Sequence, residues 1–228
     1  MSSPSPEVVN EMDRMEMLRA WLNTQLPGQS IDLVSASSDA SFRRYFRVGG
    51  NHGKTVIAMD APPALENCAP FIHVAGLLHD AGVNLPEILG QDAANGFLLL
   101  SDLGKTTYLD ALQPLRGEAG SRSQIDALYR DAIRSLVIIQ LASREGQLPD
   151  YDRALLEREL GLFPEWYVQS QLGVILDADQ ARIMASTFDA LLDNNIAQAR
   201  VFVHRDYHSR NLMVCNPNPG ILDFQDAV

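Results

Sequence analysis

Three oxygen-bearing side chains late in the sequence have types and spacing that suit divalent-metal chemistry. Asp206 lies in a polar loop, Asn211 follows after four intervening residues, and Asp223 comes after a further turn. The flanking runs are short, apolar and typical of strands: 201–203, 212–215 and 221–222. We expect these strands to bring the three side chains together. Two carboxylates and one amide oxygen are hard ligands, which suit Mg²⁺.

The order of these residues also matches a template for phosphoryl transfer from a nucleoside triphosphate. In that template the first Asp accepts the proton of the attacking hydroxyl, while the Asn and a later Asp-Phe pair hold the metal that bridges the phosphates. Here Asp206 takes the first role, and Asn211 and Asp223 take the metal-binding roles. The cofactors predicted by this pattern are ATP and Mg²⁺.

Two other interpretations of the same loop stay open at this point. His204, Asp206 and His208 alternate as H-x-D-x-H, a spacing that also suits a metal hydrolase with imidazole ligands. Alternatively, these polar residues do no more than cap strand ends. A serine nucleophile is unsupported, because no G-x-S-x-G surrounds Ser209.

Composition narrows the classes of partner. The chain has 228 residues, 46% of them hydrophobic, so it can bury a sizeable core. Its formal net charge is −11 and its basic residues form no run, which disfavours a nucleic-acid partner. Two cysteines do not indicate a disulfide framework, and no signal sequence or membrane-spanning apolar run occurs. We therefore expect a cytoplasmic protein with no membrane partner.

Hydrophobic periodicity places the remaining elements. Helices are expected at 7–26, 67–81, 106–112, 123–144, 153–171 and 179–199. Strands are expected at 31–36, 43–48, 55–59 and 97–100, and the first three are expected to form a small antiparallel sheet. The order is therefore a sheet-rich first part followed by helices and then the polar loops.

The runs HRDYHSRN at 204–211 and ILDF at 221–224 resemble the protein-kinase-like fold, and specifically the aminoglycoside phosphotransferase family of small-molecule kinases. Tyr207, His208 and Gln225 depart from the usual protein-kinase residues and favour the small-molecule branch. The resemblance implies an α+β, bilobal fold with a small antiparallel sheet lobe at 1–100, a hinge at 101–104 and a mainly helical lobe at 105–228. The C-terminal part of that second lobe is expected to be missing, because family members continue beyond the second metal-binding Asp.

The same resemblance implies where the nucleotide binds. The turn at 37–42 takes the place of the family's phosphate-covering loop, where small side chains at Ala40 and Ser41 let backbone N–H groups approach phosphate. The backbone of the hinge would pair with adenine through Ser101, Asp102 and Leu103.

One departure from the family concerns the cation that usually neutralises the phosphates. The kinase-like pattern has a Lys on the third strand, but that strand reads VIAMD at 56–60. We expect Arg43, Arg44 or Lys54 to replace it. Glu66 is the candidate helix residue that would pair with this cation, and its partner is left open.

Three runs are similar to the amino-sugar kinases of this family: ASFRRYFR at 40–47, MDAPP at 59–63 and HRDYHSRN at 204–211. This similarity implies ATP-dependent phosphorylation of the anomeric hydroxyl of N-acetylmuramate or N-acetylglucosamine in peptidoglycan recycling, with His208 and Arg210 beside the acceptor. The alternatives are an aminoglycoside, choline or homoserine kinase, and a non-catalytic nucleotide-binding pseudokinase. The sequence does not indicate an oligomeric state.

Overall fold

The computed structural model describes residues 11–37, 42–49, 54–118 and 120–228. The chain divides into two compact units. The first comprises Met1–Ile139 with His204–Asp226, and the second comprises Gln140–Val203 with Ala227–Val228. Each unit is described separately below.

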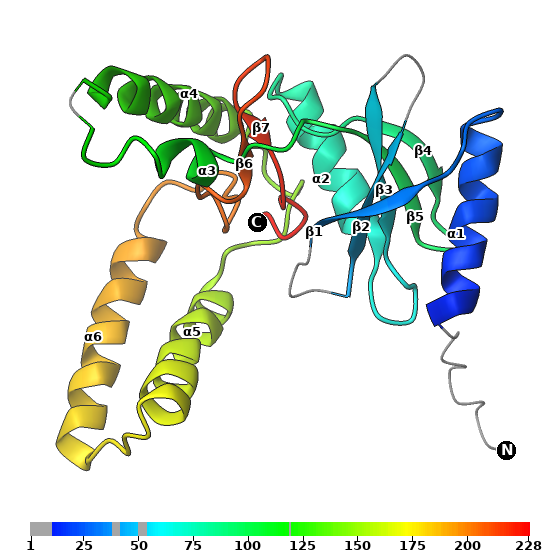
Figure 1. The fold of residues 1–228 in the computed structure, drawn as a ribbon. Coiled ribbons are helices and arrows are strands. Elements are labelled where there is room, and N and C mark those ends of the chain that lie inside the picture. Colours follow the sequence, from blue (N-terminus) through cyan, green and yellow to red (C-terminus); the bar gives the residue numbers. More distant parts are fainter. Residues whose placement is uncertain (1–10, 38–41, 50–53, 119) are drawn as a thin grey trace, which may run out of the picture. The chain divides into compact units, whose positions relative to one another are not determined.

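The first unit is built on a five-stranded antiparallel sheet in the order β1-β2-β3-β5-β4 (Figure 1). Its strands are β1 (Leu33–Ser37), β2 (Arg44–Gly49), β3 (Thr55–Asp60), β4 (Ile88–Asp92) and β5 (Phe97–Ser101). The predicted strands at 31–36, 43–48, 55–59 and 97–100 are confirmed with small shifts at their ends. No strand was predicted at β4, because its ILGQD run is short and contains a glycine.

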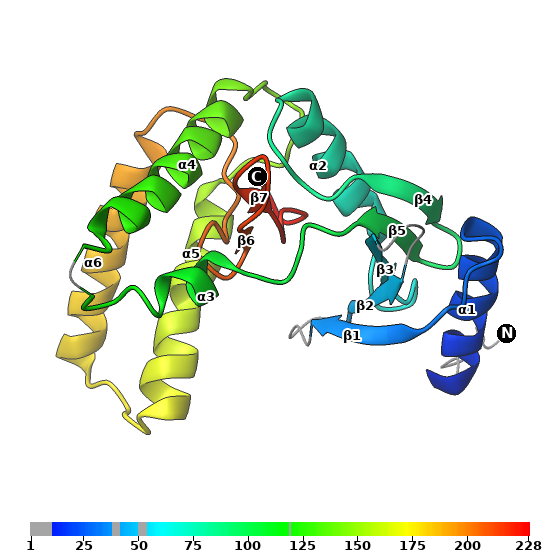
Figure 2. The ribbon, with the colours of Figure 1, turned by 45° about the horizontal axis from the view of Figure 1, so that its top comes forward.

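Side chains alternate between the two faces of this sheet, so the register decides what each residue meets. On one face Val48, Ala58, Phe97 and Leu99 pack against Leu18 and Leu22 of helix α1 (Glu11–Gln25). Helix α2 (Cys68–Asp80) lies on the other face (Figure 2). The α1 face is the main core of the sheet, and the α2 face borders the cavity described below.

A buried carboxylate ties α1 to the sheet. Asp60 is 0% exposed and forms ion pairs with Arg14 of α1 at 2.5 Å and with Arg44 of β2 at 2.6 Å. The Arg14 guanidinium also lies over the Phe97 ring, 4.8 Å from its centroid. A buried charge is tolerated only when it is paired. The Asp60 carboxylate can stay buried because Arg14 and Arg44 both neutralise it.

Helix α2 begins at a side-chain cap and ends at a glycine. Asn67 Oδ1 accepts a hydrogen bond from the Ala69 N–H at 2.9 Å, and Gly82 follows the helix with φ of +84°. On its inner side Phe71 packs against Phe224, with ring centroids 4.8 Å apart. The helix thereby supports the segment that carries Asp223.

The rest of the first unit surrounds the short hairpin of β6 (Leu212–Met213) and β7 (Gly220–Ile221). Helix α3 (Tyr108–Leu112) begins with a capping box between Thr107 and Asp110, and α4 (Arg122–Leu141) follows. The Tyr108 hydroxyl accepts a hydrogen bond from Asn218 at 2.8 Å, and burial raises the pKa of this tyrosine to about 12.

The second unit contains α5 (Arg153–Leu162), the π-helix η2 (Phe163–Gln171) and α6 (Ala178–Ile196). Arg153 of α5 pairs with Asp193 and Asp189 of α6, so the two helices are linked by charge. The predicted helix at 153–171 changes from α to π geometry beside Pro164, a residue that removes a backbone donor from the helix.

Two further predictions can be compared with this structure. The expected strand at 201–203 is wrong, although the Val203 and Val228 backbones exchange hydrogen bonds of 2.8 and 3.0 Å. Both cysteines, Cys68 and Cys215, are free thiols, as the composition indicated. Among the described residues, no helix is both long enough and apolar enough to cross a membrane.

Candidate functional site

The loop from His204 to Asn211 is held from the inside, which leaves Asp206 exposed. His204 is 2% exposed, and its Nε2 lies 3.0 Å from the Leu222 carbonyl oxygen. The Tyr207 hydroxyl donates to the Ala132 carbonyl of α4 at 2.7 Å. Arg205 has φ of +71°, a left-handed conformation that is unusual for a residue with a side chain. Anchors on both sides of Asp206 thus fix the turn that presents its carboxylate.

His204 anchors this loop in its neutral form. Burial lowers the pKa of His204, although the Leu222 carbonyl and the carboxylates of Asp223 and Asp206 oppose that shift. Because a carbonyl only accepts hydrogen bonds, Nε2 carries the proton and donates it. His204 therefore ties the loop to the strand that precedes Asp223.

Asn211 and Asp223 are in direct contact. The Asn211 amide nitrogen donates to Asp223 Oδ2 at 3.1 Å and to the Asp206 carbonyl oxygen at 3.1 Å. The Leu222 N–H donates to the Asn211 carbonyl oxygen at 2.9 Å, which joins the two segments through the backbone. With its nitrogen engaged twice, the Asn211 amide has a fixed orientation, and Oδ1 is its remaining polar atom.

Asp223 is oriented by residues that follow it. Gln225 donates from Nε2 to Asp223 Oδ1 at 2.8 Å, so each carboxylate oxygen of Asp223 accepts one amide N–H. Asp223 itself has φ of +59°, and the next residue, Phe224, is fully buried against α2. The sequence marked Gln225 only as a departure from protein kinases, and its contact with Asp223 is a positioning role that was missed.

The donor set fits a hard divalent cation. A carboxylate and an amide oxygen on adjacent segments supply the ligand chemistry that Mg²⁺ prefers, with water and phosphate oxygens completing such sites. The imidazole alternative is not supported, because His204 is buried against a carbonyl. Within the described parts of the chain, no three His, Cys, Asp or Glu side chains gather as a metal-binding group.

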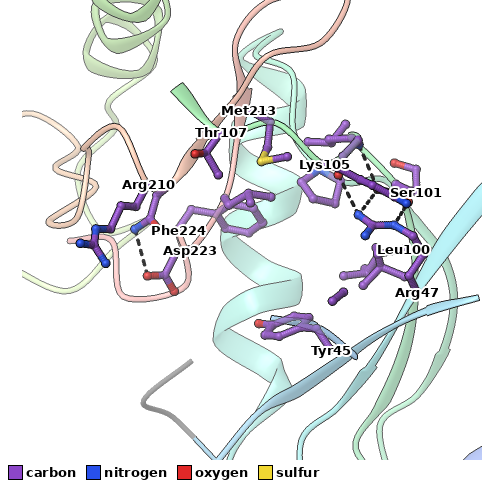
Figure 3. A pocket seen from close by; sticks show the side chains of 18 of the residues that line it. Tyr45, Arg47, Leu100, Ser101, Lys105, Thr107, Arg210, Met213, Asp223 and Phe224 are labelled. Atoms are coloured by element: carbon purple, nitrogen blue, oxygen red, sulfur yellow. Dashed lines mark hydrogen bonds and ion pairs between the residues drawn. The ribbon is translucent and has the colours of Figure 1, made fainter. Parts of the chain in front are cut away.

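One cavity collects much of the predicted site (Figure 3). The sheet contributes Tyr45, Arg47, Ile57 and Leu100 to its wall, and the predicted hinge at 101–104 contributes Ser101, Asp102 and Leu103. Opposite them lie Arg210, Asn211, Asp223 and Phe224. The predicted adenine-binding and metal-binding residues thus border the same space.

Not every predicted residue lines this cavity. Asp206 and His208 are exposed residues of the same loop, and they are not among the lining residues. Ala40 and Ser41 lie outside the described residues. Lys105 lines the cavity, although the sequence reading gave it no role.

The three candidate phosphate cations have different surroundings. Arg44 faces α1 and pairs with the buried Asp60, whereas Lys54 is exposed at the start of β3. Arg43 pairs with Glu66 at 3.0 Å, and the two side chains are only 12% and 15% exposed. Glu66 is therefore the partner of Arg43. Arg43 lies one residue before β2, and none of the three candidate cations is among the residues that line the cavity.

The Asp102 carboxylate, in the predicted hinge, accepts hydrogen bonds from side chains of the sheet. Asp102 accepts hydrogen bonds from Arg47, Thr55 and the Gly104 N–H. Burial alone would raise the pKa of Asp102, but the hydrogen bonds outweigh it and the pKa lies below its ordinary value. The same contact raises the pKa of Arg47, so this is a stable ion pair at neutral pH.

Curated relatives carry one name. The chain is 48% identical over 225 residues to the N-acetylmuramate/N-acetylglucosamine kinase of Pseudomonas aeruginosa, covering 94% of this chain and 64% of that protein. It is 45% identical over 217 residues to the kinase of the same name from Neisseria meningitidis serogroup B, covering 95% and 63%. The chain thus spans somewhat less than two thirds of the length of these relatives.

Solved structures share the fold at low sequence identity. The GDP and kanamycin complex of APH(2")-IIia matches with a TM-score of 0.62 at 16% identity, covering 93% of this chain and 73% of that one. The choline kinase LicA from Streptococcus pneumoniae matches with a TM-score of 0.59 at 11% identity, covering 93% and 68%. These likenesses confirm the protein-kinase-like fold. A family model described as the phosphotransferase enzyme family matches residues 32–228, and the chain belongs to that family.

Proposed function

We propose that this chain carries the nucleotide site and catalytic loop of an ATP-dependent kinase that phosphorylates an amino sugar, N-acetylmuramate or N-acetylglucosamine. The observation that carries this proposal is the convergence of the hinge (101–104) with Asn211 and Asp223 on one cavity. The names of the curated relatives support the choice of acceptor. A cytoplasmic location belongs to the same proposal, because ATP is the phosphate donor.

The metal would be held by Asn211 and Asp223. When bound, Mg²⁺ would supply positive charge that offsets the negative charge of the phosphates during transfer. Gln225 keeps the Asp223 carboxylate oriented toward the cavity. The Asn211 side-chain nitrogen already donates two hydrogen bonds, so Oδ1 is the atom that would bind the metal. These hydrogen bonds hold both side chains in fixed orientations.

Asp206 is the proposed general base. Its carboxylate accepts the proton from the sugar hydroxyl as the oxygen attacks the γ-phosphorus, the bond to the leaving ADP oxygen breaks, and the products are a sugar phosphate and ADP. Fixed placement of this carboxylate matters, since positioning supplies much of the catalysis in phosphoryl transfer. The anchors at His204 and Tyr207 provide that placement.

The acceptor is proposed to lie beside Arg210 and His208. Arg210 lines the cavity, and its guanidinium points away from Arg47 and Phe224 in Figure 3. Nδ1 of the His208 ring accepts a hydrogen bond from the backbone N–H of Arg210 at 3.3 Å, and this contact shapes the turn between the two residues. A cation on this side can pair with the carboxylate of the lactyl group that distinguishes N-acetylmuramate from N-acetylglucosamine.

A pseudokinase is the second candidate, because β3 lacks the usual Lys. The Arg43–Glu66 pair weakens that alternative, since it supplies a cation held by a carboxylate, as the usual Lys is in the phosphoryl-transfer template. Aminoglycoside and choline acceptors have no support beyond the fold, because those matches are only 11% and 16% identical.

Measuring ADP release and product structure tests the proposal. The chain and the Pseudomonas aeruginosa relative are assayed in parallel with ATP, Mg²⁺ and each acceptor: N-acetylmuramate, N-acetylglucosamine, kanamycin, choline and homoserine. We expect both proteins to form a C1 phosphate on the amino sugars. Methyl glycosides of the same sugars lack the anomeric proton and should not react. Turnover of a methyl glycoside or phosphate on O6 would overturn the anomeric mechanism, and kanamycin as the sole acceptor would overturn the choice of substrate.

A further inference from the structure

The Asp102 carboxylate is saturated with hydrogen bonds although it borders the cavity. Arg47 Nη2 and the Gly104 N–H donate to Oδ1 at 3.1 and 2.9 Å. Arg47 Nε and the Thr55 hydroxyl donate to Oδ2, each at 2.5 Å. The side chain is 5% exposed. A carboxylate offers about four lone-pair sites, and all of them are used here.

The three side chains come from different parts of the sheet. Arg47 lies on β2 and Thr55 begins β3, whereas Asp102 follows β5. Arg47 also donates to the Gly104 carbonyl oxygen at 2.7 Å, so one guanidinium holds two hinge residues. We refer to Arg47, Thr55 and Asp102 together as the carboxylate clamp.

The clamp bears on which base the hinge can read. Adenine presents one donor and one acceptor along its outer edge, and a main-chain carbonyl and N–H suffice to match them. Guanine presents two neighbouring N–H donors, and a carboxylate is the side chain that accepts both. Asp102 is placed beside the base site, but its oxygens are already occupied and its charge is paired with Arg47.

We infer that the carboxylate clamp makes this cavity selective for adenine nucleotides by withholding the Asp102 carboxylate from guanine. The inference rests on the proposed nucleotide site and adds a specificity-determining role for Arg47 and Thr55. Opening the clamp frees carboxylate oxygens next to the base, so guanine gains an acceptor for two neighbouring N–H donors, whereas adenine presents only one donor along that edge.

Calorimetric titration with Mg·ADP and Mg·GDP tests this without requiring turnover. The parent chain should bind ADP more tightly than GDP. In Thr55→Val and Arg47→Met the ratio of the two dissociation constants should shift toward GDP by roughly tenfold or more, the size expected for hydrogen bonds to a charged acceptor. Adding Asp102→Ala to either variant should remove the gain for GDP, since the freed carboxylate is then absent.

The ratio separates selectivity from general damage, because lost stability weakens both nucleotides alike. Thr55→Val removes a single hydroxyl from an exposed strand end, so it decides the matter if Arg47→Met fails to fold. An unchanged ratio in a folded variant would overturn the clamp, as would a parent chain that prefers GDP. If the parent chain binds neither nucleotide, the proposed nucleotide site is wrong and this inference falls with it.

Discussion

The charge that offsets the ATP phosphates is predicted to come from Arg43, and three single substitutions test this. Arg43 lies one residue before β2 and is held by Glu66 at 3.0 Å. It lies four residues before Arg47, which at about 3.3 Å per strand residue places it roughly 13 Å further from the hinge. We expect a triphosphate whose base binds at the predicted hinge to extend in this direction.

Arg43→Ala should raise the KM for ATP or lower kcat by about tenfold or more, which corresponds to about 1.4 kcal/mol of transition-state stabilisation. Arg44→Ala should act differently, because it removes one of two cations from the fully buried Asp60. Breaking such a pair costs about 3–5 kcal/mol of folding free energy, while the ATP kinetics of the folded fraction should be unchanged. Lys54→Ala should be near neutral in both respects, since this side chain is exposed.

Steady-state kinetics with ATP, combined with urea unfolding of each variant, separates these effects. Arg43→Lys is the matched control, because it keeps the positive charge but not the fork geometry that meets Glu66. We expect it to recover part of the lost activity. If Arg43→Ala turns over ATP with parental constants while remaining folded, metal and backbone donors suffice and the assignment of Arg43 is refuted.

Three further outcomes are expected. Asp206→Asn should lower turnover by about 10²- to 10⁴-fold with Mg·ATP affinity retained, and turnover at the parental rate would exclude Asp206 as the base. Asp223→Ala should instead abolish Mg²⁺-dependent nucleotide binding in a titration. Arg210→Ala should weaken kcat/KM for N-acetylmuramate by roughly tenfold relative to N-acetylglucosamine, because only the former carries a carboxylate, and equal losses for both sugars would contradict that contact. Since burial lowers the pKa of His204, its contribution to folding is fully present above the ordinary value of 6.5 and is lost as pH falls through the folded-state pKa. Urea unfolding from about pH 8 to about pH 5 should therefore show a smaller loss of stability in His204→Gln than in the parent chain, and identical pH profiles would contradict this account.

The sequence alone predicted most of the helices and strands, and it gave the candidate site residues from their types and spacing. The types and spacing of Asp206, Asn211 and Asp223 are local features, and the structure brings Asn211 and Asp223 into contact at 3.1 Å. Strands and helices followed from hydrophobic periodicity, because each must bury one face whatever its neighbours are. Periodicity did not predict β4, because its short ILGQD run has little apolar periodicity and depends on pairing with β5.

The tertiary structure decided which charges meet. Arg43 and Arg44 are adjacent in sequence, yet they pair with different carboxylates, Glu66 and Asp60 respectively. Asp60 is the register partner of Arg44 across β2 and β3, whereas Glu66 lies in the segment between β3 and α2, so strand pairing and chain packing determine the two partners. The same holds for Arg47, whose contact with Asp102 joins residues 55 positions apart. Such pairs depend on strand register and on long-range packing, which local sequence patterns do not encode.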